Sequence, residues 1–124
     1  EYYEEGILAN YAQIPDMLEQ LCKETNEKLG NVHDILTVKL AADFHYRFMH
    51  IKPFGAGNIT VGLLMMNYIQ MMFREPLILI PGEDKAKYLA AIKMQKDTPT
   101  PETFERFVGE ELLSQLRKEV TPQK

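Results

Sequence analysis

The chain has 124 residues, which is enough for one domain with one hydrophobic core. Its net charge of −4 argues against a general nucleic-acid-binding surface, and its most apolar run, residues 59–73, is too short to span a membrane. A single cysteine, Cys22, excludes a disulfide framework within the chain. The acidic first residues do not have the pattern of a secretory signal peptide, so we expect a cytoplasmic protein. Because the sequence opens without a methionine, we also expect it to be part of a longer one.

The first segment predicts a loop or short strand followed by a helix. Residues 1–13 show no lasting period of apolar residues. Apolar residues at helical spacing then predict a helix over 14–29, with Pro15 in its first turn. Gly30 follows the last apolar position and is expected to stop this helix.

A second helix is predicted from Asp34, which is a good N-cap, to just before Lys52–Pro53, because a residue that precedes proline disfavours the α conformation. One side of this helix is broadly apolar, with Ile35, Leu36, Val38, Leu40, Ala41, Phe44, His45, Phe48 and Met49. The other side is expected to carry Lys39, Asp43, Tyr46 and Arg47.

The stretch 51–58 contains two glycines and a proline and predicts a tight turn that leads directly into a helix over 59–73. We expect Asn58 to cap this helix. Apolar residues occupy nearly every side of it, so it is predicted to be the central helix of the fold, buried all round. Gly62 would let another element pack closely near its start.

The second half of the chain predicts a connector and two more helices. Residues 77–80 lie between prolines and are expected to be extended, but four residues alone cannot form a sheet, so the prediction is an all-α domain. A helix is predicted over 84–95 with Tyr88, Leu89 and Ile92 facing inward. Thr100 and Pro101 would open the last helix, which runs to about Lys118 and buries Phe104, Phe107, Val108, Leu112 and Leu116.

Several segments resemble the Fic-domain family: Ala41–Phe48, Ile51 with Pro53–Phe54, Gly57–Asn58, Leu63–Ile69, and Pro76–Pro81 with Tyr88 and Leu89. Upstream, Ile14–Leu21 is similar to the helix that follows the family's substrate-binding flap. The resemblance implies a single Fic-like domain over residues 1–124, in which 1–13 is a remnant of the flap region, 14–118 is the helical core and 119–124 is a tail.

The resemblance also implies a chemistry. Fic proteins mostly transfer AMP from ATP to a target hydroxyl, with the signature HPFxDGNGRxxR. In that signature the histidine is the general base and the acidic residue holds Mg²⁺. The glycines and the helix N-terminus cradle the phosphates, and the arginines bind phosphate.

This chain keeps only part of that signature. Pro53, Phe54, Gly57 and Asn58 match it, whereas Lys52, Ala56, Ile59, Thr60 and Leu63 replace the histidine, the acidic residue, the second glycine and the two arginines, respectively. The residues that shape the turn are therefore present, and the residues that carry the chemistry are absent together.

The candidate catalytic residue is Lys52, at the position of the family's general base. It could act as a base if burial lowered its pKa by several units, or it could attract phosphate as a fixed charge. The alternative interpretation is a solvated lysine on a loop.

Gly55, Gly57 and Asn58 could form an anion cradle at the helix N-terminus, or simply a glycine turn with an Asn cap, and Ile59 would crowd an approaching phosphate. Asn67 and Tyr88 match positions near the family's nucleotide pocket, but a buried Asn and a helix Tyr are also ordinary core residues.

The histidines and carboxylates predict no metal site. His45 matches a position that the family often keeps as histidine, where we expect a core role or a supporting role. His50 could replace the lost base only through a shift of register; otherwise it ends the helix. The three histidines lack metal-ligand spacing and the loop has no carboxylate.

We therefore predict a degenerate Fic-fold domain without ordinary AMP transfer, acting as a binding or regulatory module toward an unidentified protein partner. The alternative is a nucleotidyl- or phosphotransferase of altered chemistry, in which Lys52 and the loop 55–58 bind phosphate. No cofactor is expected under the first prediction, and ATP with Mg²⁺ enters only under the second. Neither nucleic acid nor a membrane is expected as a partner, and the oligomeric state is left open.

Overall fold

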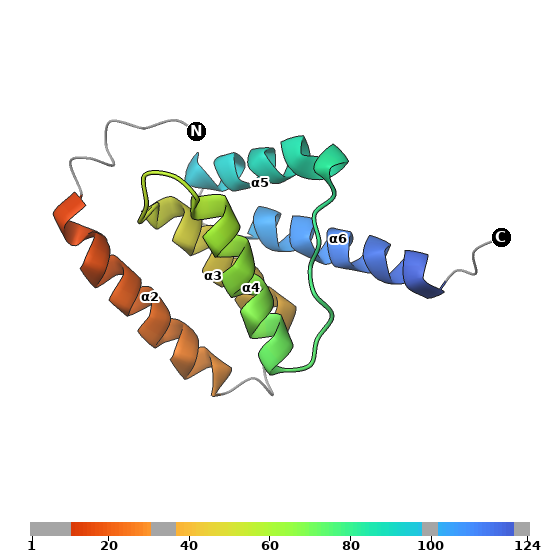
Figure 1. Ribbon diagram of the computed structural model, residues 1–124, viewed down its shortest axis with the longest axis horizontal. Helices are drawn as coiled ribbons and strands as arrows, with labels where there is room; N and C mark the ends of the chain where they lie inside the picture. Colours follow the sequence, from red (N-terminus) through yellow and green to blue (C-terminus); the bar gives the residue numbers. More distant parts are fainter. Residues whose placement is uncertain (1–10, 31–36, 98–101, 121–124) are drawn as a thin grey trace.

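A computed structural model describes residues 11–30, 37–97 and 102–120. These ranges contain five α-helices and two short 3₁₀ turns, and they contain no strand, which confirms the predicted all-α class (Figure 1). The elements in order are η1 (Tyr11–Gln13), α2 (Ile14–Leu29), α3 (Thr37–Ile51), α4 (Asn58–Met72), η3 (Gly82–Asp84), α5 (Lys85–Asp97) and α6 (Glu102–Val120). None of the described helices is long and apolar enough to cross a bilayer.

The predicted helix boundaries agree with the structure to within a few residues. The predicted caps at Asp34 and Thr100, together with Pro101, lie outside the described residues, as do Ile35, Leu36 and most of the tail. The connector between Pro76 and Pro81 is extended without being part of a sheet, as expected.

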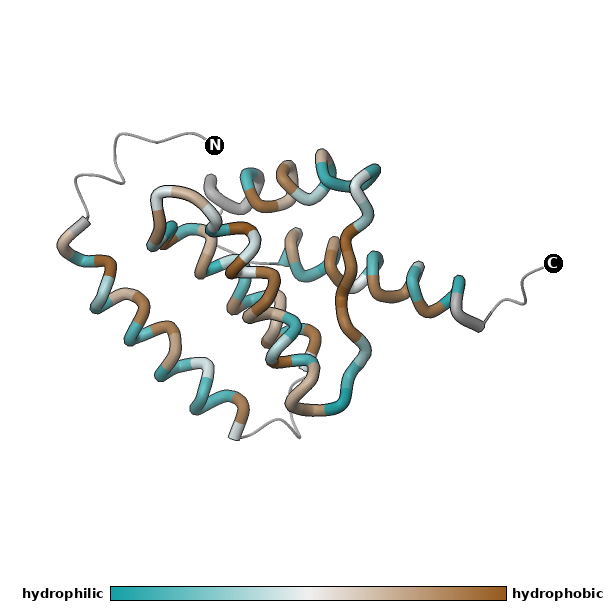
Figure 2. The backbone as a smooth tube through the Cα atoms, in the orientation of Figure 1, coloured by the Kyte–Doolittle hydropathy of each residue, from teal (hydrophilic) through white to brown (hydrophobic). Residues whose placement is uncertain are grey.

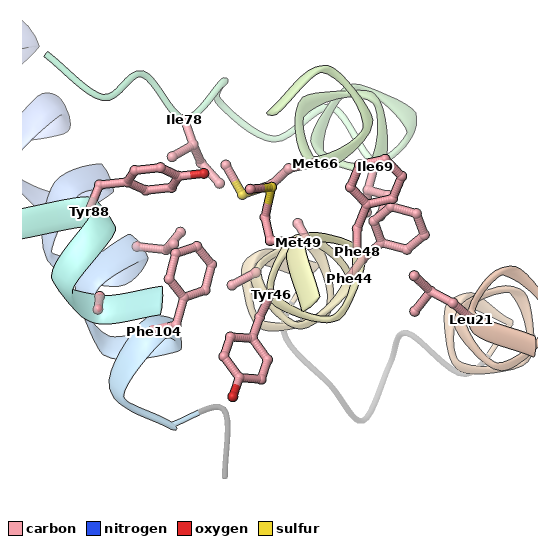
Figure 3. Packing of buried hydrophobic residues seen from close by; sticks show 14 residues of the cluster. Leu21, Phe44, Tyr46, Phe48, Met49, Met66, Ile69, Ile78, Tyr88 and Phe104 are labelled. Carbon is pink, nitrogen blue, oxygen red and sulfur yellow. The ribbon is translucent and has the colours of Figure 1, made fainter. Parts of the chain in front are cut away.

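The helix at the centre of the fold is α3, and the prediction that α4 is buried on all sides is wrong. More than half of the residues of α3 are buried, and this helix packs against α2, α4 and α6 (Figure 3). In α4, by contrast, four large apolar residues are exposed: Leu64, Tyr68, Met71 and Met72. An apolar composition on every side does not bury a helix unless neighbouring elements cover each side, and within the described residues the outer side of α4 has no cover.

Two smaller predictions about side-chain direction are also wrong. Tyr46, expected on the polar side of α3, is buried, because α6 covers that side and brings Phe104 to within 6.3 Å between ring centroids. Leu89, expected to face inward, is 38% exposed, and Ala91 is buried in α5 together with Tyr88. A short residue fits where α5 and α6 approach each other.

Helices α3 and α4 approach closely at Gly62. A Cβ atom built on Gly62 would lie 2.9 Å from both Cε1 and Nδ1 of the His45 ring and 3.1 Å from Cδ2 of Phe48. The two contacts at 2.9 Å are shorter than those that Cβ atoms make, so a side chain at this position would displace the His45 ring, and glycine lets α4 pack against the rings of α3. The expected role of Gly62 is confirmed.

His45 is fully buried between α3, α4, α5 and α6. Its Nε2 atom is 2.6 Å from the Tyr88 hydroxyl of α5, and its ring stacks on Phe104 of α6 at 5.4 Å. Burial lowers the pKa of His45 to about 4 and raises that of Tyr88 well above its usual range. A neutral His45 therefore links three helices through one side chain, as expected for a core residue.

Three side-chain amides hold the extended connector in place. Asn67 of α4 donates to the Ile78 carbonyl at 3.0 Å and accepts from the Ile78 N–H at 2.7 Å. Gln115 of α6 makes the equivalent pair with the Leu77 carbonyl and the Leu79 N–H, and Gln70 donates to the Pro76 carbonyl. The amides supply the backbone partners that a neighbouring strand would otherwise provide.

We predict that Gly62→Ala lowers the free energy of unfolding, whereas Gly109→Ala does not. Alanine favours a helix over glycine by up to about 1 kcal/mol, but overpacking a tight core costs about 1–3 kcal/mol. At Gly62 the clash with two buried rings should dominate, and at Gly109 of α6 nothing lies within 4 Å of the added carbon. Urea unfolding of the two variants measures both effects, and equal stabilisation by both would contradict the packing described here.

We also predict that the domain loses stability as the pH falls below 6.5. The unfolded chain binds a proton at His45 near pH 6.5, whereas the folded chain binds it only near pH 4, so the unfolded state takes up more protons between these values. The contribution of His45 to the free energy of unfolding should fall by about 2 kcal/mol between pH 7 and pH 5. Urea unfolding at both pH values should show a smaller pH dependence for His45→Gln; an identical dependence would contradict the burial of a neutral histidine.

Candidate functional site

The candidate site is the turn that connects α3 to α4, which we call the signature loop (residues 52–57). Lys52 adopts a left-handed backbone conformation with φ of 50°, and its N–H donates to the Phe48 carbonyl at 3.1 Å. This conformation costs a residue other than glycine roughly 1–2 kcal/mol, and it directs the chain out of α3. Pro53 then prevents any continuation of the helix. Local sequence thus fixes where the loop begins.

Asn58 closes the signature loop. Its side-chain Oδ1 accepts from the Phe54 N–H at 3.0 Å, and its Nδ2 donates to the Phe54 carbonyl at 2.9 Å. Only 6% of the residue is exposed. Phe54 is half-exposed, and its ring lies 6.4 Å from that of Phe48.

The prediction that Asn58 caps α4 is therefore wrong. Asn58 is the first residue of the helix, Gly57 occupies the N-cap position with φ of 87°, and among the described residues no side chain makes a capping hydrogen bond at this terminus. The physical reason is that the Asn58 amide is oriented toward Phe54, whose N–H binds its Oδ1 and whose carbonyl accepts from its Nδ2. A side chain already engaged in closing the loop cannot also turn toward the helix.

The N-terminus of α4 retains backbone donors. The Val61 N–H donates to the Gly57 carbonyl at 3.0 Å, which is the first bond of the helix. The three N–H groups before it, of Asn58, Ile59 and Thr60, have no acceptor within the helix by geometry. Together with the helix dipole, such groups favour an anion at this end. Gly55, Ala56 and Gly57 are exposed beside them.

The side chains around this terminus supply little charge. Lys52 is half-buried, Ala56 presents a methyl group, and Ile59 packs against the core cluster. Within the part of the chain that the structure describes, no group of three or more His, Cys, Asp or Glu side chains could hold a metal ion. The geometry provides backbone donors and one lysine, but no carboxylate from the loop.

Asn67 and Tyr88 do not lie in the signature loop. Asn67 is nine residues along α4 from Asn58, which corresponds to about 14 Å of helix, and its amide binds Ile78. Tyr88 is 2% exposed and its hydroxyl contacts His45. These contacts support the interpretation of both as structural residues; a role in nucleotide binding stays a prediction.

A cavity lies beside the end of α3, away from the signature loop. His50, whose ring is 4.3 Å from that of Tyr46, lines a cavity of about 320 Å³ with Met17 and Gln20 of α2. Arg47 also lines it and binds Glu24 of α2 at 2.7 Å. Sequence reasoning missed this cavity, because its walls come from two helices that only the fold brings together.

The chain is similar to one known protein family and to several of its members. The sequence profile of the Fic/DOC family matches residues 4–70, which is more than half of the chain. The protein adenylyltransferase Fic of Drosophila erecta is 29% identical over 85 residues, covering 68% of this chain and 16% of that protein. Its counterparts in Drosophila virilis and Drosophila melanogaster are each 33% identical over 73 residues, covering 59% of this chain and 15% of each.

The chain thus spans about a sixth of the length of these relatives. No solved structure gives a significant match to it. The matched residues include α2, α3, the signature loop and nearly all of α4, so the family match covers the candidate site. The chain belongs to the Fic/DOC family.

Proposed function

We propose that this chain is a degenerate Fic domain that does not carry out ordinary AMP transfer and acts as a binding or regulatory module. The observation that carries the proposal is the contrast within the signature loop. The contacts that shape the loop, between Asn58 and Phe54, are intact. The positions that would act on a nucleotide hold Lys52, Ala56, Thr60 and Leu63 instead of a base, an acid and two arginines.

The sizes of the expected rate effects support a complete loss of AMP transfer rather than a reduced rate. General base catalysis alone is worth about 10²–10⁴-fold, and the family's histidine base is absent from this chain. Mg²⁺ in phosphate chemistry is usually held by one or two carboxylates, and Ala56 offers none. Because these losses affect different parts of one reaction, a single compensating residue would not restore it.

A second candidate function rests on the free end of α4. Its first turn has no side-chain cap, and the N-cap Gly57 has nothing within 4 Å of the position of its missing Cβ. A phosphate group could therefore reach the backbone donors, with Lys52 supplying positive charge. Under this alternative the chain is a nucleotidyl- or phosphotransferase of altered chemistry, in which Lys52 and residues 55–58 bind the phosphate of the donor.

We predict that the chain does not transfer AMP. The measurement is incubation with Mg²⁺ and ATP labelled at the α-phosphate, followed by detection of label on the chain itself and on proteins of a host extract. A variant with Lys52→His, Ala56→Asp, Ile59→Gly, Thr60→Arg and Leu63→Arg rebuilds the signature and serves as the control; circular dichroism must first show that it folds, because Ile59 and Leu63 pack against the core. Label transfer by the unaltered chain above the level without enzyme would overturn the proposal.

Nucleotide binding separates the two candidate functions. Under the first, ATP, ADP and CDP leave the melting temperature unchanged with or without Mg²⁺. Under the second, a ligand at 100 times its Kd stabilises the fold by about 2.7 kcal/mol, and Lys52→Ala should remove that shift. Lys93→Ala, an exposed lysine of α5, is the control and should preserve it. A shift that requires Mg²⁺ would count against the first candidate function, because ATP with Mg²⁺ is expected only under the second.

A further inference from the structure

One side of α4 is apolar and exposed. Leu64, Tyr68 and Met71 follow one another at i, i+4 and i+7 and are 65%, 57% and 62% exposed, and Met72 beside them is 51% exposed. Residues at this spacing lie on one face of a helix. The opposite face, with Gly62, Met66 and Ile69, packs into the core. Large apolar side chains therefore line both sides of this helix.

The extended connector widens this surface. The two hydrogen bonds from Asn67 hold Ile78 beside α4, where its side chain is buried. Alternate residues of an extended chain point to opposite sides, so Leu77 and Leu79 face outward, and they are 41% and 60% exposed. Figure 2 shows apolar residues along both α4 and the neighbouring connector. We call these six side chains the outer apolar face: Leu64, Tyr68, Met71, Met72, Leu77 and Leu79.

The outer apolar face has no charge on the helix that carries most of it. None of the residues of α4, Asn58–Met72, is Asp, Glu, Lys, Arg or His, whereas α2, α5 and α6 all carry several. A helix side that stays in water normally carries charged residues. A centre without charge suits a symmetric contact in particular, because each charge near a two-fold axis would meet its own like charge. The exposed Arg74 and Glu75 lie in the turn after α4, away from the stripe of Leu64, Tyr68 and Met71.

The size of the face fits one half of a small dimer interface. At 41–65% exposure, and with about 200 Å² for a large side chain, the six residues offer roughly 600 Å² of apolar surface. A standard interface buries about 800 Å² on each partner, with an apolar centre and a polar rim. We propose that the outer apolar face pairs with the same face of a second copy of this chain to form a two-fold symmetric dimer.

The symmetry places Tyr68 at the centre of the contact. In an isologous pair, residue i of one copy meets residue j of the other and the reverse contact repeats. Tyr68 lies midway between Leu64 and Met72, so a two-fold axis through the middle of the stripe brings Tyr68 near its own symmetry mate. An aromatic side chain at the centre of an interface is a typical hot spot.

The test is the mass of the 124-residue chain in solution as a function of concentration, by sedimentation equilibrium. We expect a dimer whose Kd rises by about ten- to a hundredfold in Leu64→Glu and in Tyr68→Glu. Both residues are exposed, so the monomers should remain folded, which circular dichroism and the melting temperature check. Leu113→Glu is the matched control: Leu113 is a 48% exposed leucine on α6, outside the face, and its variant should dimerise as the unaltered chain does.

A covalent measurement tests the geometry independently. In a Cys22→Ser background, Tyr68→Cys should form a disulfide-linked dimer under mild oxidation, whereas Leu113→Cys should not. A chain that stays monomeric at every concentration would overturn the proposal and leave the face to a different occupant, such as an apolar helix of another protein. A dimer that is insensitive to Leu64→Glu and Tyr68→Glu would overturn it as well.

Discussion

The close contact between Gly62 of α4 and the His45 ring of α3 sets the position of everything that follows in the chain. With no side chain at Gly62, α4 approaches until its backbone meets the ring, and His45 is then enclosed by Tyr88 and Phe104 from α5 and α6. The same approach fixes the start of α4, four residues earlier, against the end of α3. The signature loop therefore spans a short, defined gap between two helices that are locked together.

In the signature loop, the groups that fix the backbone shape are different from the side chains that would act on a nucleotide. Its shape depends on backbone conformations at Lys52 and Gly57 and on the paired hydrogen bonds between Asn58 and Phe54, none of which involves the side chains at 52, 56, 60 or 63. The hydrogen bonds between Asn58 and Phe54 do not depend on the identity of the side chains at those positions. A Fic-fold domain can thus keep its scaffold while the residues that would handle a nucleotide are replaced, which is the basis of the proposed loss of transfer.

Helix α4 has apolar residues both on the side that packs into the core and on the side that is exposed. Met66 and Ile69 contribute to the core, while Leu64, Tyr68 and Met71 lie outside it. The connector reinforces this division, because amides from α4 and α6 satisfy its backbone groups and so orient Ile78 inward and Leu79 outward. Side-chain amides here replace the hydrogen bonds of a neighbouring strand, and the apolar surface outside them is not covered by any described element.

The sequence alone determined the helices, their approximate ends, the glycine turn and the family, because periodicity, proline and glycine act locally and the motif is contiguous. It also identified Gly62 as a close-packing position and His45 as a core residue. Where the sequence-based expectation of burial failed, only the tertiary structure decided which side was covered. Tyr46 is covered because α6 lies against it, Leu64 and Tyr68 are exposed because no described element covers them, and Asn58 turns away from the helix because Phe54 offers its amide two partners. The type of a residue determines whether its side chain is more stable in the core or in water. The arrangement of neighbouring elements decides whether that side chain is in fact buried.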